Sequence, residues 1–248
     1  MSIDFDGTDQ YLTCGSGASI DGLFDAGGSM VFHCIVDAYV NAAAGDRIAE
    51  KVLTTSKLGW ITGPKDNAGD TVKTFILLHY FSDTAGVWKA PDNSVSLGAM
   101  THFVVTYNNN NVANNPAMYI NGTSVAVTEV STPVGTRGTD GAQTLSIGSD
   151  AANVRPFNGK VEDFRLYKRI LSAEEAAILA AGFRGPLGGE AMWLSMTEAR
   201  GVSGGFGGAS LTNGTNLCPD LSANSNDGDP VNTPTGVASE FPRYGVAV

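Results

Sequence analysis

The stretch from residue 157 to residue 179 constrains the fold of this chain more than any other. Residues 161–167, Val-Glu-Asp-Phe-Arg-Leu-Tyr, read as a strand rich in apolar and aromatic side chains. Asn158-Gly159 stands just before it, and this dipeptide favours a type I′ turn, whose two central residues both need φ > 0. The sequence therefore predicts a tight turn that leads into a buried strand.

A short helix is predicted directly after that strand. Ser172 and Glu175 have the spacing of a capping box, in which each side chain bonds the backbone amide of the other residue. The alanine-rich residues that follow favour a helix near residues 172–181, and Gly182 is a natural stop. Few other segments of the chain have helical periodicity, so this pattern indicates an all-β fold with one short helix.

The same stretch resembles the closing motif of the laminin-G-like, pentraxin-related branch of the concanavalin A-like jelly rolls. The residues that match this motif are Phe157, Gly159, Val161, Asp163, Phe164, Arg165, Leu166, Tyr167, Arg169, Leu171, Ser172, Glu174 and Glu175. The resemblance implies a two-sheet antiparallel jelly-roll sandwich. It says little about function, because this fold serves lectins, adhesins, receptors, enzyme appendages and virion proteins.

Other segments resemble the same family. Residues 3–12 are similar to its opening phrase, and residues 101–107 and 117–125 are similar to two of its strands. The residues between these last two segments, 108–116, form a polar tip with six asparagines. The strand expected at residues 29–40 has one clearly apolar face, and His33 on its other face is expected to be hydrogen-bonded or outward rather than catalytic.

The C-terminal segment departs from the family order. Residues 191–198 and 220–229 resemble phrases that precede the opening strand in many relatives, but here they come last. We therefore predict a jelly-roll body at residues 1–185 and a glycine-rich segment at 186–248 that supplies edge strands to the same domain. Residues 191–196 in particular are expected to pair within the sandwich. A truncated second copy is the alternative, although 60 residues bury little core alone.

Composition and charge limit the classes of partner that the protein is expected to bind. The net charge of −10 disfavours binding to nucleic acid and to anionic membranes. The first residues contain neither a basic region nor an apolar run, so no signal peptide is predicted. Cys14, Cys34 and Cys218 lack metal-ligand spacing and are expected to be buried thiols.

No enzyme is predicted. The E-x-D-x-x-E pattern of the β-glucanases on this fold does not occur, and the adjacent Glu162 and Asp163 are expected to point to opposite faces of their strand. Ser203 lies in a literal G-x-S-x-G, but it stands in a glycine-rich loop without the helix that a nucleophile elbow needs.

No cofactor is required by any motif, and Ca²⁺ is the one ligand ion considered. The resemblance implies Asp163 as a Ca²⁺ ligand, because the corresponding carboxylate serves so in some concanavalin A-like folds. Residues 220–226 alternate polar side chains as an EF-hand loop does, but lack its glycine and glutamate, so a self-bonded Asx loop is the alternative. Candidates for a sugar-binding platform are Trp60, Trp88, His79 and Tyr80, although aromatic residues in strands also form cores.

Two functional hypotheses follow. The first is a virion protein of the capsid-decoration type, made in the cytoplasm and placed on the virion surface, with capsid proteins or further copies of itself as partners. The second is a lectin or adhesin domain that binds a cell-surface glycan, with or without Ca²⁺. Binding to sugars separates the two hypotheses.

Overall fold

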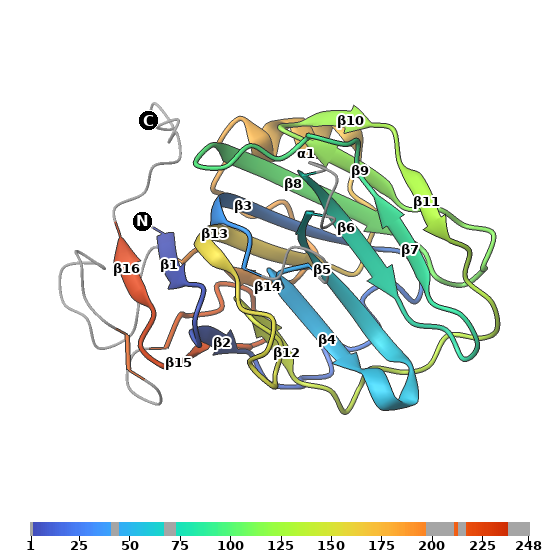
Figure 1. The fold of residues 1–248 in the computed structure, drawn as a ribbon, viewed down its shortest axis with the longest axis horizontal. Helices are drawn as coiled ribbons and strands as arrows, with labels where there is room; N and C mark the ends of the chain where they lie inside the picture. Colours follow the sequence, from blue (N-terminus) through green and yellow to red (C-terminus); the bar gives the residue numbers. More distant parts are fainter. Residues whose placement is uncertain (1, 41–44, 67–72, 197–210, 213–216, 238–248) are drawn as a thin grey trace.

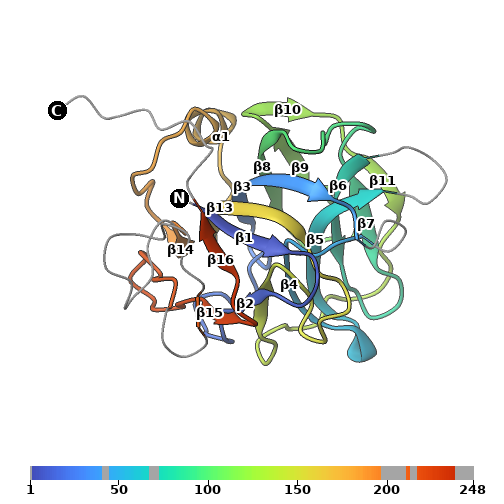
Figure 2. The same ribbon diagram turned by 60° about the vertical axis from the view of Figure 1, so that its left-hand side comes forward.

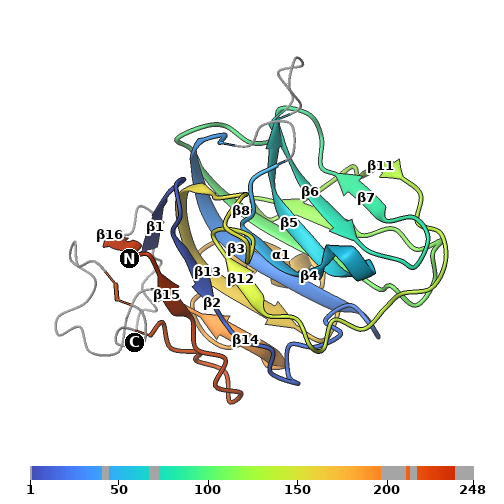
Figure 3. The same cartoon turned by 60° about the horizontal axis from the view of Figure 1, so that its bottom comes forward.

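Two antiparallel sheets packed face to face form the body of the protein (Figure 1). The computed structural model describes residues 2–40, 45–66, 73–196, 211–212 and 217–237. Seen from another side, the two sheets form two layers (Figure 3). This arrangement is the jelly-roll sandwich that the closing motif predicted.

Sheet A has eight strands among the described residues. In spatial order they are β10 (Thr123–Val125), β9 (Ala117–Ile120), β8 (Met100–Tyr107), β3 (Gly28–Ala38), β13 (Asn158–Tyr167), β1 (Ser2–Asp6) and β16 (Thr235–Val237), and β14 (Glu190–Leu194) also pairs with β13.

Sheet B also has eight strands in the described part of the chain. In spatial order they are β11 (Thr128–Ser131), β7 (Gly86–Lys89), β6 (Lys73–His79), β5 (Leu58–Asp66), β4 (Ala49–Leu53), β12 (Leu145–Ile147), β2 (Tyr11–Thr13) and β15 (Asp229–Val231). A 3₁₀ turn, η1 (Thr54–Ser56), joins β4 to β5.

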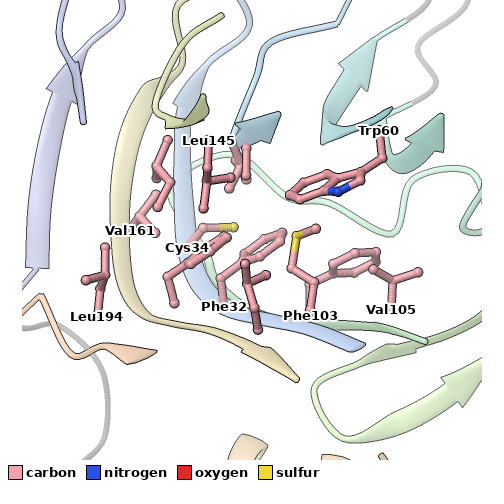
Figure 4. Close-up of a cluster of buried hydrophobic side chains, with 14 of the residues drawn as sticks. Phe32, Cys34, Trp60, Phe103, Val105, Leu145, Val161 and Leu194 are labelled. Carbon is pink, nitrogen blue, oxygen red and sulfur yellow. The ribbon is translucent and has the colours of Figure 1, made fainter. Parts of the chain in front are cut away.

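The core fills the space between the sheets (Figure 4). Alternate residues of β3 and β8 point inward, and the rings of Phe32 and Phe103 lie 5.3 Å apart between centroids. Trp60 of sheet B enters from the other side and is 1% exposed. Because side chains alternate across a strand, the apolar face predicted for residues 29–40 supplies one wall of this core.

The helix α1 (Ala173–Ala180) covers the outer face of sheet A. Its capping box is present as predicted: the Glu175 amide donates to Ser172 Oγ at 3.2 Å, and the Ser172 amide donates to Glu175 Oε2 at 2.9 Å. Ala176 and Leu179 are buried against apolar side chains of the sheet. In the described residues, no helix is long and apolar enough to cross a membrane.

The turn predicted at Asn158-Gly159 is wrong. Both residues belong to β13, and the pairing of β13 with β3 shifts register between them. Gly159 has φ 146°, and a Cβ there would lie 2.0 Å from the carbonyl oxygen of Ile35. Glycine is needed at this position because the backbone of β3 approaches closely, which is a long-range cause that a dipeptide pattern does not report.

Strands from the C-terminal segment take part in both sheets. β16 lies beside β1, so the two ends of the described chain are neighbours (Figure 1, Figure 2). β15 pairs with β2. β1 and β14 pair with successive parts of β13: β1 with residues 158–161 and β14 with residues 164–167. Residues 191–194 thus lie in a paired strand. The division predicted between a jelly-roll body, residues 1–185, and a C-terminal segment stays a prediction.

Candidate functional site

Asp163, the predicted Ca²⁺ ligand, is a buried counter-ion in this structure. Its side chain is fully buried, at the point where β13 bulges between its pairings with β1 and β14. Oδ1 accepts hydrogen bonds from Arg165 Nε at 2.9 Å and Trp193 Nε1 at 2.7 Å. Oδ2 accepts from Arg165 Nη2 and Arg184 Nη1, both at 3.0 Å.

These contacts do not fit a Ca²⁺ ligand. Ca²⁺ takes six to eight oxygen ligands, whereas both Asp163 oxygens face guanidinium and indole N–H groups. Among the described residues, no cluster of three or more His, Cys, Asp or Glu side chains is placed to hold a metal ion. The geometry makes Asp163 the counter-ion of Arg165, whose side chain is fully buried, and a second carboxylate partner of Arg184 beside Glu162.

The prediction that Glu162 and Asp163 point to opposite faces is wrong. Both carboxylates contact the guanidinium group of Arg184, at 3.7 Å from Glu162 and 3.0 Å from Asp163. The bulge in β13, with Asp163 at φ 54°, interrupts the alternation that the prediction assumed. Both side chains are fully buried, so they offer no accessible carboxylate pair.

The loop at residues 220–226, rich in Asn and Ser, bonds its own backbone. The carboxylate of Asp220 accepts the amides of Ser222 and Asn226 at 2.9 Å each, and the Ser222 hydroxyl at 2.9 Å. It also accepts the amide of Trp193 at 2.8 Å, which fastens the loop to β14. The loop is therefore the self-bonded Asx structure named as the alternative to a Ca²⁺ site.

The aromatic platform suggested by the sequence is not at the surface. Trp60, Trp88 and His79 are 1%, 0% and 3% exposed, and Tyr80 is partly buried. Trp88 Nε1 donates to Asn115 Oδ1 at 2.6 Å, at the base of the polar tip. Trp60, Trp88 and His79 are thus buried in the interior and form no exposed platform for a sugar. Ser203 lies outside the described residues.

A cleft of about 390 Å³ lies at the polar tip. Three loops meet there: residues 80–85 between β6 and β7, residues 108–116 between β8 and β9, and residues 132–144 between β11 and β12. We call it the asparagine cleft. Its lining residues are Phe81, Asn109, Asn110, Asn111, Val112, Gly135, Thr136 and Arg137.

Two of these loops are joined by backbone hydrogen bonds. Phe81 pairs with Arg137 and Thr84 with Val134 as isolated antiparallel bridges. The amide of Ser82 donates to the carbonyl oxygen of Thr136 at 2.8 Å, and Ser82 Oγ accepts the Thr136 amide at 3.0 Å. This wall of the cleft is held by paired backbone, so it is formed before any ligand arrives.

Asn109 lies at the base of the cleft with its amide orientation fixed. Its Nδ2 donates to Asp25 Oδ1 at 3.3 Å and contacts His79 Nε2 at 2.9 Å. The Asp25 carboxylate only accepts hydrogen bonds, so this side of the Asn109 amide must be the NH₂ group. The opposite atom, Oδ1, is buried and has no hydrogen-bond partner among the described residues.

His79 supports Asn109 in its neutral form. Nδ1 lies 3.0 Å from the carbonyl oxygen of Tyr80, which can only accept, so Nδ1 carries the proton and Nε2 accepts from Asn109. Burial of the ring lowers the pKa of His79 from 6.5 to about 4, although the bond to Tyr80 and the nearby Asp25 carboxylate oppose this shift. The imidazole therefore remains neutral at physiological pH.

The cleft contains one cationic side chain among its lining residues, Arg137. Its Nη1 forms an ion pair with Asp25 Oδ1, the oxygen that also accepts from Asn109. Arg137 and Asp25 have side chains that are 34% and 41% exposed, so water screens this pair. Asp25 thus links the buried amide of Asn109 to the guanidinium group at the rim.

Other cavities are lined by described residues elsewhere on the molecule. One is lined by Asp4, Asp6 and Asp37 among others, and another by residues of the self-bonded loop at 220–226. Neither brings together three loops around a buried acceptor. The run of consecutive asparagines in the sequence indicates the polar tip. The sequence does not indicate Phe81 and Arg137, because only the fold brings their segments to the tip.

A family model for the concanavalin A-like lectin/glucanases superfamily matches residues 36–177. No curated protein matches the chain. Among solved structures, the chain is similar to a candidate carbohydrate-binding protein from Bacteroides ovatus, with a TM-score of 0.61 and 14% identity over 96% of this chain and 60% of that one. The chain thus spans less than two thirds of that protein.

Two further structures have the same fold. A native heptameric SAP-like pentraxin from Limulus polyphemus has a TM-score of 0.52 and 14% identity, over 72% of this chain and 81% of that one. The CBM40 domain of the IT-sialidase from Ruminococcus gnavus, solved with α2,3-sialyllactose, has a TM-score of 0.50 and 13% identity, over 72% of this chain and 96% of that one. At such identities the likeness concerns the fold alone.

Proposed function

Because the chain belongs to the concanavalin A-like lectin/glucanase superfamily, we propose that it is a carbohydrate-binding domain without catalytic activity. The asparagine cleft is its saccharide site. One observation carries this proposal: the cleft is lined by asparagine amides and a guanidinium group, and Asn109, one of its lining residues, has a buried Oδ1 without a partner among the described residues. A buried polar atom that lacks a hydrogen bond is costly, and a ligand hydroxyl would satisfy it.

The chemistry of the lining suits a sugar. Hydroxyl groups both donate and accept, as do the side-chain amides of Asn110 and Asn111 at the exposed side of the cleft. Val112, which is 36% exposed, adds apolar surface for the C–H face of a sugar ring. A volume of about 390 Å³ is at the small end of ligand pockets. The site therefore fits a short saccharide or the end of a longer one.

Two features support binding without catalysis. The lining residues include no carboxylate or histidine, which are the usual general acids and bases. Two of the structural neighbours are named for carbohydrate binding, the candidate protein from Bacteroides ovatus and the CBM40 domain with its sialyllactose.

Glycan-array binding followed by calorimetry tests the proposal. The variant Val112→Trp fills the cleft, and Val154→Trp makes the same change at a valine that is 60% exposed and outside the cleft lining. The wild type should bind at least one glycan, and Val112→Trp should lose about tenfold or more in affinity, or roughly 1.4 kcal/mol. Val154→Trp should bind as the wild type does. Equal affinity of all three proteins, or no binding to any glycan, would overturn the proposal.

The capsid-decoration role favoured by the sequence has no observation in its support, in the fold or in the comparisons. It stays a prediction, as does the virion surface as its location. Co-sedimentation with particles from the source of the protein tests it independently of sugar binding.

A further inference from the structure

We propose that the asparagine cleft selects uncharged sugars over carboxylated ones, and that Asp25 determines this selectivity. The inference rests on the proposed function, since it names the class of saccharide that the same site takes. It is carried by the hydrogen-bonded chain from His79 through Asn109 and Asp25 to Arg137.

The guanidinium group that a sugar carboxylate would need is already paired. Arg137 contacts Asp25, and Asp25 is held in place because its carboxylate accepts from Asn109 and its amide donates to the carbonyl oxygen of Gly22 at 3.0 Å. A carboxylated ligand would have to displace Asp25 from Arg137 or bind beside an unpaired negative charge. Like charges that share one site repel each other, and at side chains that are 34% and 41% exposed water screens this repulsion only in part.

The acceptor at the base of the cleft requires a hydroxyl group, and not a carboxylate, as its partner. Asn109 Oδ1 can only accept a hydrogen bond, so its partner must be a donor. A sugar hydroxyl can donate, whereas an ionised carboxylate cannot. A neutral sugar can therefore satisfy Asn109 Oδ1 and accept from the remaining N–H groups of Arg137 while the ion pair stays intact.

Charges behind the cleft act in the same direction. Asp140 is close enough to both Asp21 and Asp25 for its charge to interact with theirs, so the three carboxylates contribute to one negative region. Lys51 offsets part of this charge through its contact with Asp21 at 3.0 Å. The protein as a whole carries a net charge of −10. An anionic glycan thus meets no net attraction as it approaches.

The substitution Asp25→Asn tests the inference. Asparagine has nearly the same shape, and its Oδ1 can still accept from Asn109, but it leaves Arg137 without a counter-ion. Asp83→Asn is the matched control, because it removes the same charge from an exposed residue that has no contact with Arg137 among the ion pairs of the described residues. A melting curve for each variant establishes that it is folded.

The probes are matched glycans that differ by a carboxylate: galactose with galacturonic acid, and the methyl ester of 3′-sialyllactose with 3′-sialyllactose itself. We expect the wild type and Asp83→Asn to bind only neutral members. Asp25→Asn should gain about tenfold or more for carboxylated members, which is roughly 1.4 kcal/mol, and the gain should shrink as salt rises.

Preference of the wild type for carboxylated members would overturn the inference and leave the proposed function standing. The same follows if the folded Asp25→Asn variant has the wild-type preference. Failure of the wild type to bind any glycan would overturn the proposed function, and the inference with it.

Discussion

The ammonium group of Lys51 lies 2.6 Å from the carbonyl oxygen of Asp140, with the lysine side chain fully buried. The same nitrogen donates to the carbonyl oxygen of Gln143 at 2.6 Å and contacts Asp21 Oδ1 at 3.0 Å. Lysine is rarely buried unless its charge is paired. Lys51, which belongs to β4, thus fixes the C-terminal part of the loop at residues 132–144. The same loop carries Arg137 to the cleft.

Replacing this lysine should loosen that loop. Lys51→Met keeps the length of the side chain but leaves two carbonyl groups and a carboxylate without their donor. We expect the free energy of unfolding to fall by about 3–5 kcal/mol, as for other broken buried pairs. Lys168→Met is the control, because Lys168 bonds the carbonyl oxygen of Ala18 at 3.1 Å at the surface. Urea unfolding measures both, and equal losses would contradict this role.

His79 should make stability depend on pH. Because burial lowers its pKa to about 4, the unfolded chain binds a proton between pH 6.5 and 4 that the folded chain does not. The stabilisation is complete above pH 6.5 and is lost as pH falls towards 4, and it is worth on the order of 2–3 kcal/mol. His79→Gln keeps a donor for Tyr80 and an acceptor for Asn109 but does not titrate.

Comparing the two proteins isolates this contribution, since His33, His102 and Glu50 titrate in both. The difference in unfolding free energy between wild type and His79→Gln should change with pH from 6.5 to 4 in the direction that disfavours the wild type. A constant difference over this range would show that His79 is not buried as a neutral ring.

Asp163 should stabilise the folded protein, and Ca²⁺ should leave the melting temperature unchanged. Asp163→Asn would leave Arg165 and Arg184 facing a neutral amide, and we expect a loss of about 3–5 kcal/mol. Ca²⁺ at about 1 mM should not raise the melting temperature of the wild type, because a ligand stabilises only a protein that binds it. A Ca²⁺-dependent rise in the wild type that disappears in Asp163→Asn would restore the Ca²⁺ site.

β14 should contribute to the stability of the whole sandwich. Met192, Leu194 and Met196 are fully buried in the core, whereas Trp193 points the other way and stacks on Arg165 at 4.1 Å. Leu194→Ala should cost about 2–5 kcal/mol. Leu221→Ala, at a leucine that is 47% exposed, should cost much less. If both variants unfold at the wild-type urea concentration, the C-terminal segment is an appendage.

Local rules predicted the elements whose causes are local. The capping box at Ser172 needs only residues three positions apart, and the alternation in residues 29–40 needs only one face toward a core. The errors have distant causes. Gly159 is required by the backbone of Ile35, and Glu162 and Asp163 meet the same arginine because β13 bulges where β1 gives way to β14.

In the candidate site, too, the features with local causes are visible in the sequence and those with distant causes are not. The asparagines of the polar tip are visible in the sequence, but the cleft exists because the bridge between Phe81 and Arg137 closes its other side. The pairing of Arg137 with Asp25, which decides the ligand class, joins residues that no sequence pattern connects. Periodicity and turn chemistry report a residue's neighbours in the chain, and a binding site is made of neighbours in space.

Backbone amide chemical shifts of isotope-labelled protein, titrated with the neutral glycan that gives the strongest array signal, test the saccharide site most directly. We predict saturable shifts at residues 109–112 and 135–137, with the same dissociation constant at each. In Val112→Trp these shifts should be absent at the same glycan concentration. Saturable shifts confined to another surface, such as the outer face of sheet B, would contradict the assignment of the asparagine cleft.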